Sequence, residues 1–250
     1  VRFLLAGYAY AGEVNWDSAS FTVPDIHPWL AKDGGPRMLW DKALHVSKVA
    51  PASAYRSRDV LLKTHYVWSP LHPCSERSAA AVLVVRSPRD VLLSSWNYHR
   101  LMGSQHAADV LQYARDFIEH RGDPRYCREG YGTWEEHTRS WLSAPFPVLI
   151  VLYERMLQDP RRELLRMAGF LGIRLDPTRA AEAMRTGELD EMRRLEASAR
   201  EEGRFVPSRE GRNFFNAGRS GQSLDELEPG LDAAFEEAFA PALAELMPRL

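Results

Sequence analysis

The stretch VVRSPRDVLLSSWNYHR, residues 84–100, joins an apolar strand to the start of a helix through an arginine. Ser87 is a residue type that caps helix N-termini, Pro88 suits the first helical position, and Asp90 completes an approximate capping box. Such a helix start favours an anion, and an arginine adds donors that match a phosphate. The stretch therefore predicts an anion site at Arg86. The residues alone leave an ion pair between Arg86 and Asp90 equally open.

Three apolar runs set the fold class: VLLKTHY at 60–66, AAAVLVVR at 79–86 and PVLIVLY at 147–153. Each is continuous and mostly β-branched or Leu, which is typical of parallel strands that are covered on both faces. Amphipathic helical patterns lie between and after them, at 88–102, 107–120, 134–142 and 160–171. Alternating strands and helices predict an α/β domain with a parallel sheet, whose ligands bind at the carboxyl ends of the strands.

The composition limits the classes of partner. The 250 residues are 45% hydrophobic, enough for a sizeable core, and 32 Lys and Arg against 34 Asp and Glu give a net charge of −2. This balance offers no electrostatic case for nucleic acid or an anionic membrane, and no apolar run approaches the roughly 20 residues that span a bilayer. Cys74 and Cys127 lie far apart with no Cys/His cluster, which predicts a reducing, cytoplasmic compartment and no zinc site.

A lysine and a histidine lie at the end of the first apolar run. Lys63 and His65 are two residues apart, so a strand would place them on one face, at the edge where a ligand would lie. A histidine titrates near neutral pH and is the usual general base for a hydroxyl. Because a histidine at a strand end is more often structural, the functional interpretation depends on Lys63 and on the anion site predicted one strand away.

The C-terminal third has a different character. A charged helical pattern at 177–202 is most simply a solvated surface helix. The stretch RFVPSREGRNFFNAGRSGQS at 204–223 contains three glycines and is either a linker or a binding loop. The pattern at 231–247 predicts a final amphipathic helix with a break at Pro241.

Four motifs in order carry a resemblance to a known family: KTH at 63–65, VVRSPRDVLLSS at 84–95, VLYERMLQDPRRELLRMAGFLG at 151–172 and FFNAGRSGQ at 214–222. Together they resemble the cytosolic sulfotransferases, which use 3′-phosphoadenosine 5′-phosphosulfate (PAPS). The likeness implies one domain over 1–250 with a three-layer α/β/α fold, a central parallel sheet and a P-loop NTPase-like architecture. The stretch at 130–141, GYGTWEEHTRSW, looks like the family's Gly-Ser-Trp segment. ELDEMRRLEASAREEG at 188–203 is similar in particular to bacterial sulfotransferases of secondary metabolism that modify glycopeptide antibiotics.

The resemblance implies a role for each matching residue. Arg86 and Ser94 match the arginine and serine that contact the 3′-phosphate of the cofactor. His65 matches the histidine that takes the proton of the acceptor hydroxyl, with Lys63 beside it. Tyr153 and Leu189 match positions that contact the adenine.

The stretch from Asn216 to Gly221 departs from the family pattern. It aligns with Arg-Lys-Gly-x-x-Gly, so the glycines are kept and the two cations are replaced. Asn216, Gly218 and Arg219 are the expected cofactor contacts, with Arg219 supplying a charge from a shifted position. Cofactor affinity through this loop is therefore expected to differ from that of the family.

The sequence also contains no Pro-Lys-Ser-Gly-Thr-Thr-Trp loop, which in the family binds the donor phosphates. The stretch VRFLLAGYAY at 1–10 resembles the helix that follows this loop. The expectation is that the loop lies upstream of Val1 in a longer chain, and that the chain as given is weakly active or inactive.

The activity implied is in-line transfer of a sulfuryl group from PAPS to a hydroxyl of a small-molecule acceptor, without a metal ion. One alternative is a nucleoside or small-molecule kinase of related fold, which should carry a Gly-Lys-Ser/Thr phosphate loop. Another is a non-catalytic binding protein that has kept the fold. The loop-like segment at 102–132 is predicted to be a lid or to determine the acceptor.

Overall fold

The computed structural model describes residues 4–5, 29–30, 38–39, 61–70, 72, 75–173, 176–203, 213–215 and 218–250. Its main strands are β3, Ala81–Val85, and β4, Val148–Leu152, which pair in parallel from Ala81 with Val148 to Val85 with Leu152. A separate antiparallel pair joins β1, Trp29–Leu30, to β2, Met38–Leu39. The parallel pairing of β3 and β4 brings the residues that follow both strands to one edge.

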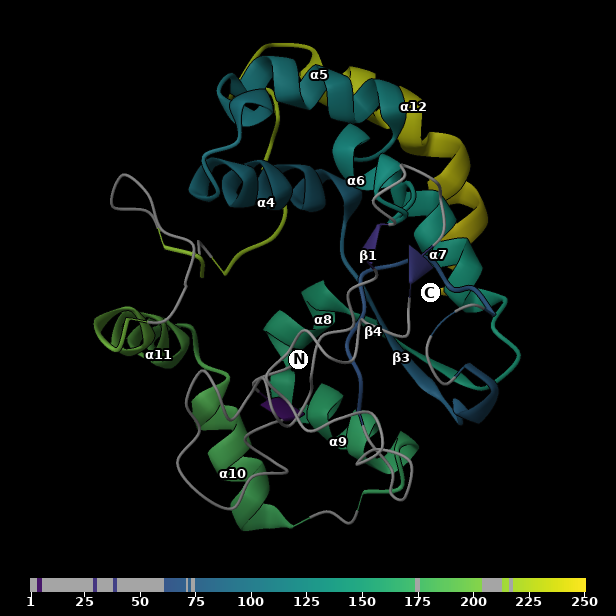
Figure 1. The fold of residues 1–250 in the computed structure, drawn as a ribbon, viewed down its shortest axis with the longest axis vertical. Helices are drawn as coiled ribbons and strands as arrows, with labels where there is room; N and C mark the ends of the chain where they lie inside the picture. The colour runs from purple at the N-terminus through teal and green to yellow at the C-terminus, as the bar shows by residue number, and fades with distance from the viewer. Residues whose placement is uncertain are drawn as a thin grey trace.

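Helices lie around this pair (Figure 1). In chain order the described helices are η2 Ser75–Arg77, α4 Pro88–Leu101, η3 Gln105–Ala107, α5 Val110–His120, α6 Pro124–Arg128, α7 Trp134–Leu142, α8 Tyr153–Gln158, α9 Pro160–Phe170, α10 Pro177–Thr186, α11 Leu189–Glu201, α12 Leu231–Leu246 and η4 Met247–Arg249. The four helical patterns predicted between 88 and 171 are confirmed, although α5 begins at Val110 and not at 107. None of the described helices is long and apolar enough to cross a bilayer.

Three helices begin in the same way, at a proline that follows an aspartate. Asp123, Asp159 and Asp176 each accept a hydrogen bond from a backbone N–H two or three residues further on. The proline occupies the first helical position, where its missing N–H costs no hydrogen bond. At the start of α7, Thr133 and Glu136 form a complete capping box.

Two apolar clusters flank the strands. The first packs Val151 of β4 against side chains of α8, α9 and α10, including Met156, Leu164, Met167 and Ala183. The second forms where α4, α5 and α12 meet, around Leu92, Phe117, Phe235 and Phe239. In Figure 1 the helices α4, α5 and α12 lie on one side of the strands, and α8, α9 and α10 lie on the other. Helices on both sides of a parallel pair confirm the predicted α/β fold class.

The run VLLKTHY does not form the predicted strand over its described residues, among which Lys63 alone makes a β-bridge. Side chains of α7 bind the backbone that follows it. The carbonyl of Tyr66 accepts from Trp141 Nε1 at 2.9 Å, and the N–H of Trp68 donates to Ser140 Oγ at 2.9 Å. An apolar run predicts burial but does not choose the partner of its backbone groups.

The predicted break at Pro241 was wrong, because α12 is continuous from Leu231 to Leu246. A proline inside a helix removes one backbone hydrogen bond. Phe239 and Ala242 are buried on the two sides of Pro241, and their packing holds the helix together through it.

The charged pattern at 177–202 forms two helices, α10 and α11, and is not simply a solvated surface. Leu195, Glu196 and Ala199 of α11 are buried. The segment at 102–132, predicted to be loop-like, contains η3, α5 and the short helix α6.

Candidate functional site

The ends of β3 and β4 carry the first side chains of the site. Arg86 follows β3, and its guanidinium lies 4.5 Å from the ring centroid of Tyr153, which follows β4. The next residue, Glu154, accepts a hydrogen bond from the N–H of Ser87 at 2.8 Å. The Nε atom of Arg86 is buried and has no hydrogen-bond partner in the described part of the chain. A cation and an aromatic ring are thus held together at the carboxyl edge of the sheet.

The glycine loop, defined as residues 218–222, reaches the same place. Nη2 of Arg86 donates to the carbonyl of Arg219 at 3.0 Å. Asp90 is fully buried in the first turn of α4 and accepts from the N–H of Gly221 at 3.0 Å and of Gln222 at 3.4 Å. The structure places no ion pair between Arg86 and Asp90, so that alternative was wrong.

The start of α4 also differs from the predicted capping box. Ser87 occupies the N-cap position, but its side chain makes no capping hydrogen bond. Asp90 binds the glycine loop and not the backbone of Ser87. Contacts with Glu154 and with the loop therefore fix this helix start from distant parts of the sequence.

A second buried carboxylate holds the chain just before the loop. Glu196 of α11 is 1% exposed and accepts from the N–H groups of Phe214, at 2.6 Å, and Phe215, at 3.0 Å. It also pairs with Arg200, and Arg193 donates from Nε to the carbonyl of Phe215 at 3.1 Å. Sequence reasoning missed Glu196, because acidic and basic residues alternate along α11 and nothing marks the one carboxylate that faces inward.

Gly218 and Leu189 meet between the glycine loop and α11. Gly218 has φ of +59°, which side-chain-bearing residues rarely adopt, and a Cβ there would stand 2.9 Å from Leu189 Cδ2. Gly221 has φ of +77°. Both glycines are therefore required by the loop backbone. Asn216, the remaining predicted loop contact, lies outside the described residues.

Ser94 and Ser95 of α4 face different surroundings. Ser94 is exposed, whereas Ser95 shares a hydrogen bond with the hydroxyl of Tyr113 at 2.5 Å. Of the two, Ser94 is the one open to a ligand.

Lys63 and His65 lie against each other, with Nζ of the lysine 2.8 Å from Nε2 of the histidine. The imidazole is exposed, and its ring centroid is 6.0 Å from that of Tyr131. Tyr131 stacks on Tyr66 at 4.5 Å. Burial, followed by the interaction with Tyr131, raises the pKa of Tyr66 above its usual range, so that this phenol stays protonated.

Trp134 connects Tyr131, the ring next to His65, to Arg86. Its indole Nε1 donates to the carbonyl of Arg86 at 2.9 Å, three residues after Tyr131. The segment 131–134 therefore runs from the ring next to His65 to the end of β3. Trp134 is a site residue to which sequence reasoning gave no role, although the GYGTW stretch had been singled out.

The arrangement is suited to an aromatic anion. A guanidinium offers several donors to a phosphate, and a tyrosine ring and a leucine offer apolar faces to a planar base. The structure brings together Arg86, Tyr153, Arg219, Gly218 and Leu189 through these contacts. Lys63 and His65 form a second group on the far side of segment 131–134.

The chain is similar to proteins of known family. A family model described as a sulfotransferase domain matches residues 11–247. The 3-beta-hydroxysteroid sulfotransferase of Cavia porcellus is 27% identical over 171 residues, 66% of this chain and 52% of the relative. Cytosolic sulfotransferase 11 of Arabidopsis thaliana is 24% identical over 229 residues, 86% of this chain and 62% of the relative. Sulfotransferase 2A6 of Rattus norvegicus is 26% identical over 247 residues, which are 95% of this chain and 77% of the relative. The chain thus spans 52% and 62% of the first two relatives.

Two solved structures share the fold. Mouse sulfotransferase SULT7A1 complexed with PAP, 3′-phosphoadenosine 5′-phosphate, superposes with a TM-score of 0.62 at 19% identity. The match covers 89% of this chain and 74% of that one. Retinol dehydratase in a complex with retinol and PAP superposes with a TM-score of 0.67 at 18% identity. The match covers 97% of this chain and 76% of that one. These likenesses confirm the predicted three-layer, P-loop NTPase-like architecture around a central parallel sheet.

Proposed function

Since the chain belongs to the sulfotransferase family, we propose that it is a single domain that transfers a sulfuryl group from PAPS to the hydroxyl of a small-molecule acceptor. The observation that carries this proposal is the meeting of Arg86, Tyr153 and the glycine loop at the carboxyl edge of the sheet. A guanidinium beside an aromatic ring suits an adenine nucleotide with a 3′-phosphate. PAP in the two related structures supports the same class of donor.

In this proposal Arg86 and Ser94 bind the 3′-phosphate, and Tyr153 and Leu189 contact the adenine. Backbone groups of the glycine loop, with Asn216 before it and Arg219 within it, complete the contacts to the donor. Arg86 is already oriented by the Arg219 carbonyl and by the Tyr153 ring, so little side-chain entropy remains to be lost when a phosphate binds.

His65 is proposed as the general base. It accepts the proton of the acceptor hydroxyl, whose oxygen forms a bond to the sulfur as the bond from sulfur to PAP breaks. Lys63, with Nζ 2.8 Å from His65 Nε2, places a positive charge near the sulfuryl oxygens, and its ammonium leaves the acceptor nitrogen of the imidazole when that nitrogen takes the proton. The step as proposed needs no metal ion, because positioning and fixed charges supply the stabilisation.

Two alternatives remain candidates. A nucleoside or small-molecule kinase would need a Gly-Lys-Ser/Thr phosphate loop, and no such tripeptide occurs in the sequence. A non-catalytic binding protein of this fold would bind PAP and transfer nothing.

A transfer assay with radiolabelled PAPS and, in parallel, radiolabelled ATP separates these three functions. The acceptors are phenols, sugars, a hydroxyl-bearing peptide and a glycopeptide, the last chosen for the predicted similarity to the bacterial antibiotic-modifying enzymes. Turnover is measured in a chain that carries a Pro-Lys-Ser-Gly-Thr-Thr-Trp loop upstream of Val1. Label from PAPS alone on an acceptor is expected. Label from ATP would support the kinase, and PAP binding without transfer from either donor would support the binding protein.

A further inference from the structure

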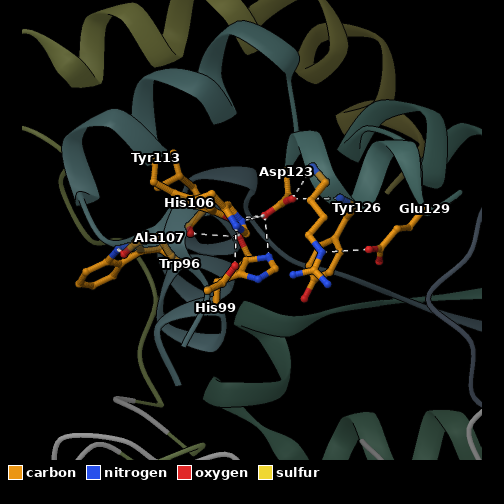
Figure 2. A network of polar contacts seen from close by, with 12 residues as sticks. Trp96, His99, His106, Ala107, Tyr113, Asp123, Tyr126 and Glu129 are labelled. Carbon is orange, nitrogen blue, oxygen red and sulfur yellow. Dashed lines mark hydrogen bonds and ion pairs between the residues drawn. The ribbon is translucent and has the colours of Figure 1, made fainter. Parts of the chain in front are cut away.

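Two imidazoles and a carboxylate converge in a region that the proposed transfer does not use (Figure 2). His99 lies near the end of α4, His106 in η3, and Asp123 caps α6. Each offers one possible ligand atom, and these three atoms lie within 4.8 Å of one another. His99 and Asp123 are 1% and 4% exposed, while the side chain of His106 is 34% exposed. The cluster is therefore buried on two sides and reachable from solvent beside His106.

His99 is the member whose polar atoms lack hydrogen bonds. Its Nε2 lies 2.8 Å from Oδ2 of Asp123 but outside hydrogen-bonding geometry, and its buried Nδ1 has no hydrogen-bond partner among the described residues. Nε2 of His106 lies 3.8 Å from the same oxygen. Buried polar groups are nearly always hydrogen-bonded. Two imidazole nitrogens and a carboxylate oxygen that lie within 4.8 Å of one another are a set of atoms that can bind one cation.

Hydrogen bonds hold the outer atoms of the other two members. Nδ1 of His106 lies 2.7 Å from the hydroxyl of Ser104. Oδ1 of Asp123 accepts from the N–H groups of Arg125, at 2.8 Å, and Tyr126, at 3.0 Å. Outer hydrogen bonds of this kind orient the ligands of protein metal sites. Oδ2 of Asp123, which faces the cluster, also accepts from the Tyr113 hydroxyl at 2.5 Å. These contacts fix the orientation of the His106 imidazole and of the Asp123 carboxylate.

A cation also lies beside the cluster. Arg125 is two residues from Asp123, and its guanidinium is paired with Glu129 at 2.9 Å, so this charge is directed to another carboxylate.

We propose that His99, His106 and Asp123 form a binding site for a divalent transition-metal ion, with Zn²⁺ as the ion that fits best. Zinc is found with three protein ligands of histidine and carboxylate type and a water in the fourth position, which here would face solvent beside His106. The sequence predicted no zinc site, because the three residues come from separate segments and carry none of the short Cys or His spacings that mark one.

Such an ion would have a structural role. It would tie the end of α4 to η3 and to the start of α6. A series of ring contacts runs from there toward the candidate base: His99 to Tyr126 at 4.7 Å, Tyr126 to Tyr131 at 4.8 Å, and Tyr131 to His65 at 6.0 Å. The ion would therefore order the segment predicted to face the acceptor, without contact with the reacting atoms.

Isothermal titration of chelator-treated protein with ZnCl₂ tests the proposal, with MgCl₂ as a cation that prefers oxygen ligands. We expect one Zn²⁺ per chain and no Mg²⁺ binding at this site. His106→Gln should lose at least about 10-fold in zinc affinity, since loss of an outer contact alone costs about 10- to 100-fold. The matched control is His120→Gln on α5, where an exposed histidine contacts a backbone carbonyl of its own helix, and its affinity should equal that of the wild type.

Two further measurements keep the proposal open to refutation. Ser104→Ala removes the outer partner of His106 without touching a ligand, and should weaken zinc binding while the fold is retained by circular dichroism. Co²⁺ in place of Zn²⁺ should give visible d–d bands that His106→Gln removes. Equal zinc affinity in wild type, His106→Gln and Ser104→Ala, or no binding by the folded wild type, would overturn the site.

Discussion

Asp90 and Asp123 are both buried carboxylates at helix starts, yet they bind different kinds of partner. Asp90 accepts from two backbone N–H groups that lie 131 and 132 residues away in the glycine loop. In Asp123, Oδ1 accepts hydrogen bonds from the start of its own helix. Oδ2 accepts from the Tyr113 hydroxyl and faces the two histidines. A carboxylate bound by main-chain donors positions a loop, whereas one that lies beside two imidazoles belongs to a set of side chains that metal ions bind.

The same difference separates the two regions that these residues serve. The donor region, which consists of Arg86, Tyr153 and the glycine loop, is held by hydrogen bonds between protein groups. Asp90 and Glu196 bind the backbone on either side of Arg219, and Arg86 donates to the Arg219 carbonyl. The histidine cluster consists of side chains that metal ions bind, and we propose that it takes one. Of the variants below, Asp90→Ala and Arg86→Ala alter the donor region and leave the histidine cluster intact.

The largest effect is expected from His65→Ala. Loss of a general base commonly lowers turnover by about 10²- to 10⁴-fold. Steady-state rates at saturating PAPS, in the chain that carries the donor loop, measure it, with His120→Gln as the control histidine. Because His65 is proposed to contact the acceptor hydroxyl and not the nucleotide, PAP affinity should stay as in the wild type. Unchanged turnover in a folded variant would remove His65 from the mechanism.

The next effect is expected from Asp90→Ala, which leaves two N–H groups of the glycine loop without their acceptor. Hydrogen bonds to a charged group contribute about 1.5 to 3 kcal/mol, so the free energy of unfolding should fall by roughly that amount and PAP binding should weaken. Urea denaturation and titration with PAP measure the two changes.

Asp109→Ala is the matched control, because Asp109 caps α5 with hydrogen bonds to its own helix. Its loss should cost about 1 kcal/mol and leave PAP affinity unchanged. If Asp90→Ala behaved like this control, the role of Asp90 as a link to the loop would be wrong.

A smaller effect is expected from pH. Burial lowers the pKa of His72 and lowers that of His137 from an ordinary 6.5 to about 4. Between pH 6.5 and 4 the imidazole of His137 binds a proton in the unfolded chain but not in the folded chain. The free energy of unfolding therefore falls as the pH falls. For His137 we expect a loss of about 1 to 2 kcal/mol across this window, after allowance for its partial exposure.

Urea denaturation at several pH values between 6.5 and 4 measures this slope. His137→Gln should flatten it, and the slope is the readout because the substitution also changes the overall stability. A variant with the wild-type slope would show that other groups set the pH dependence.

Much of the donor region could be predicted from the sequence, because it follows from local patterns. Continuous apolar runs predicted β3 and β4, helical periodicity predicted α4, α7 and α9, and the rule that ligands bind at strand ends brought Arg86 and Tyr153 to one edge. The structure confirms that these two residues meet.

The rest depends on contacts between segments that no local pattern specifies. Asp90 satisfies the spacing of a capping box, but the structure gives its oxygens to the glycine loop. Glu196 looks like the other charges of α11, and the run VLLKTHY did not show that α7 would take its backbone contacts. His99, His106 and Asp123 are brought together only by the way η3 and α6 pack on α4.

The most direct test of the donor site is a binding cycle with two nucleotides and two proteins. PAP and adenosine 5′-phosphate differ only in the 3′-phosphate, and Arg86→Ala removes the side chain proposed to bind it. A charge-assisted hydrogen bond contributes about 1.5 to 3 kcal/mol, so the wild type should bind PAP at least about 10-fold more tightly than adenosine 5′-phosphate. Titration calorimetry should show that Arg86→Ala loses this preference. Equal binding of the two nucleotides by the wild type, or an undiminished preference in the folded variant, would contradict the account.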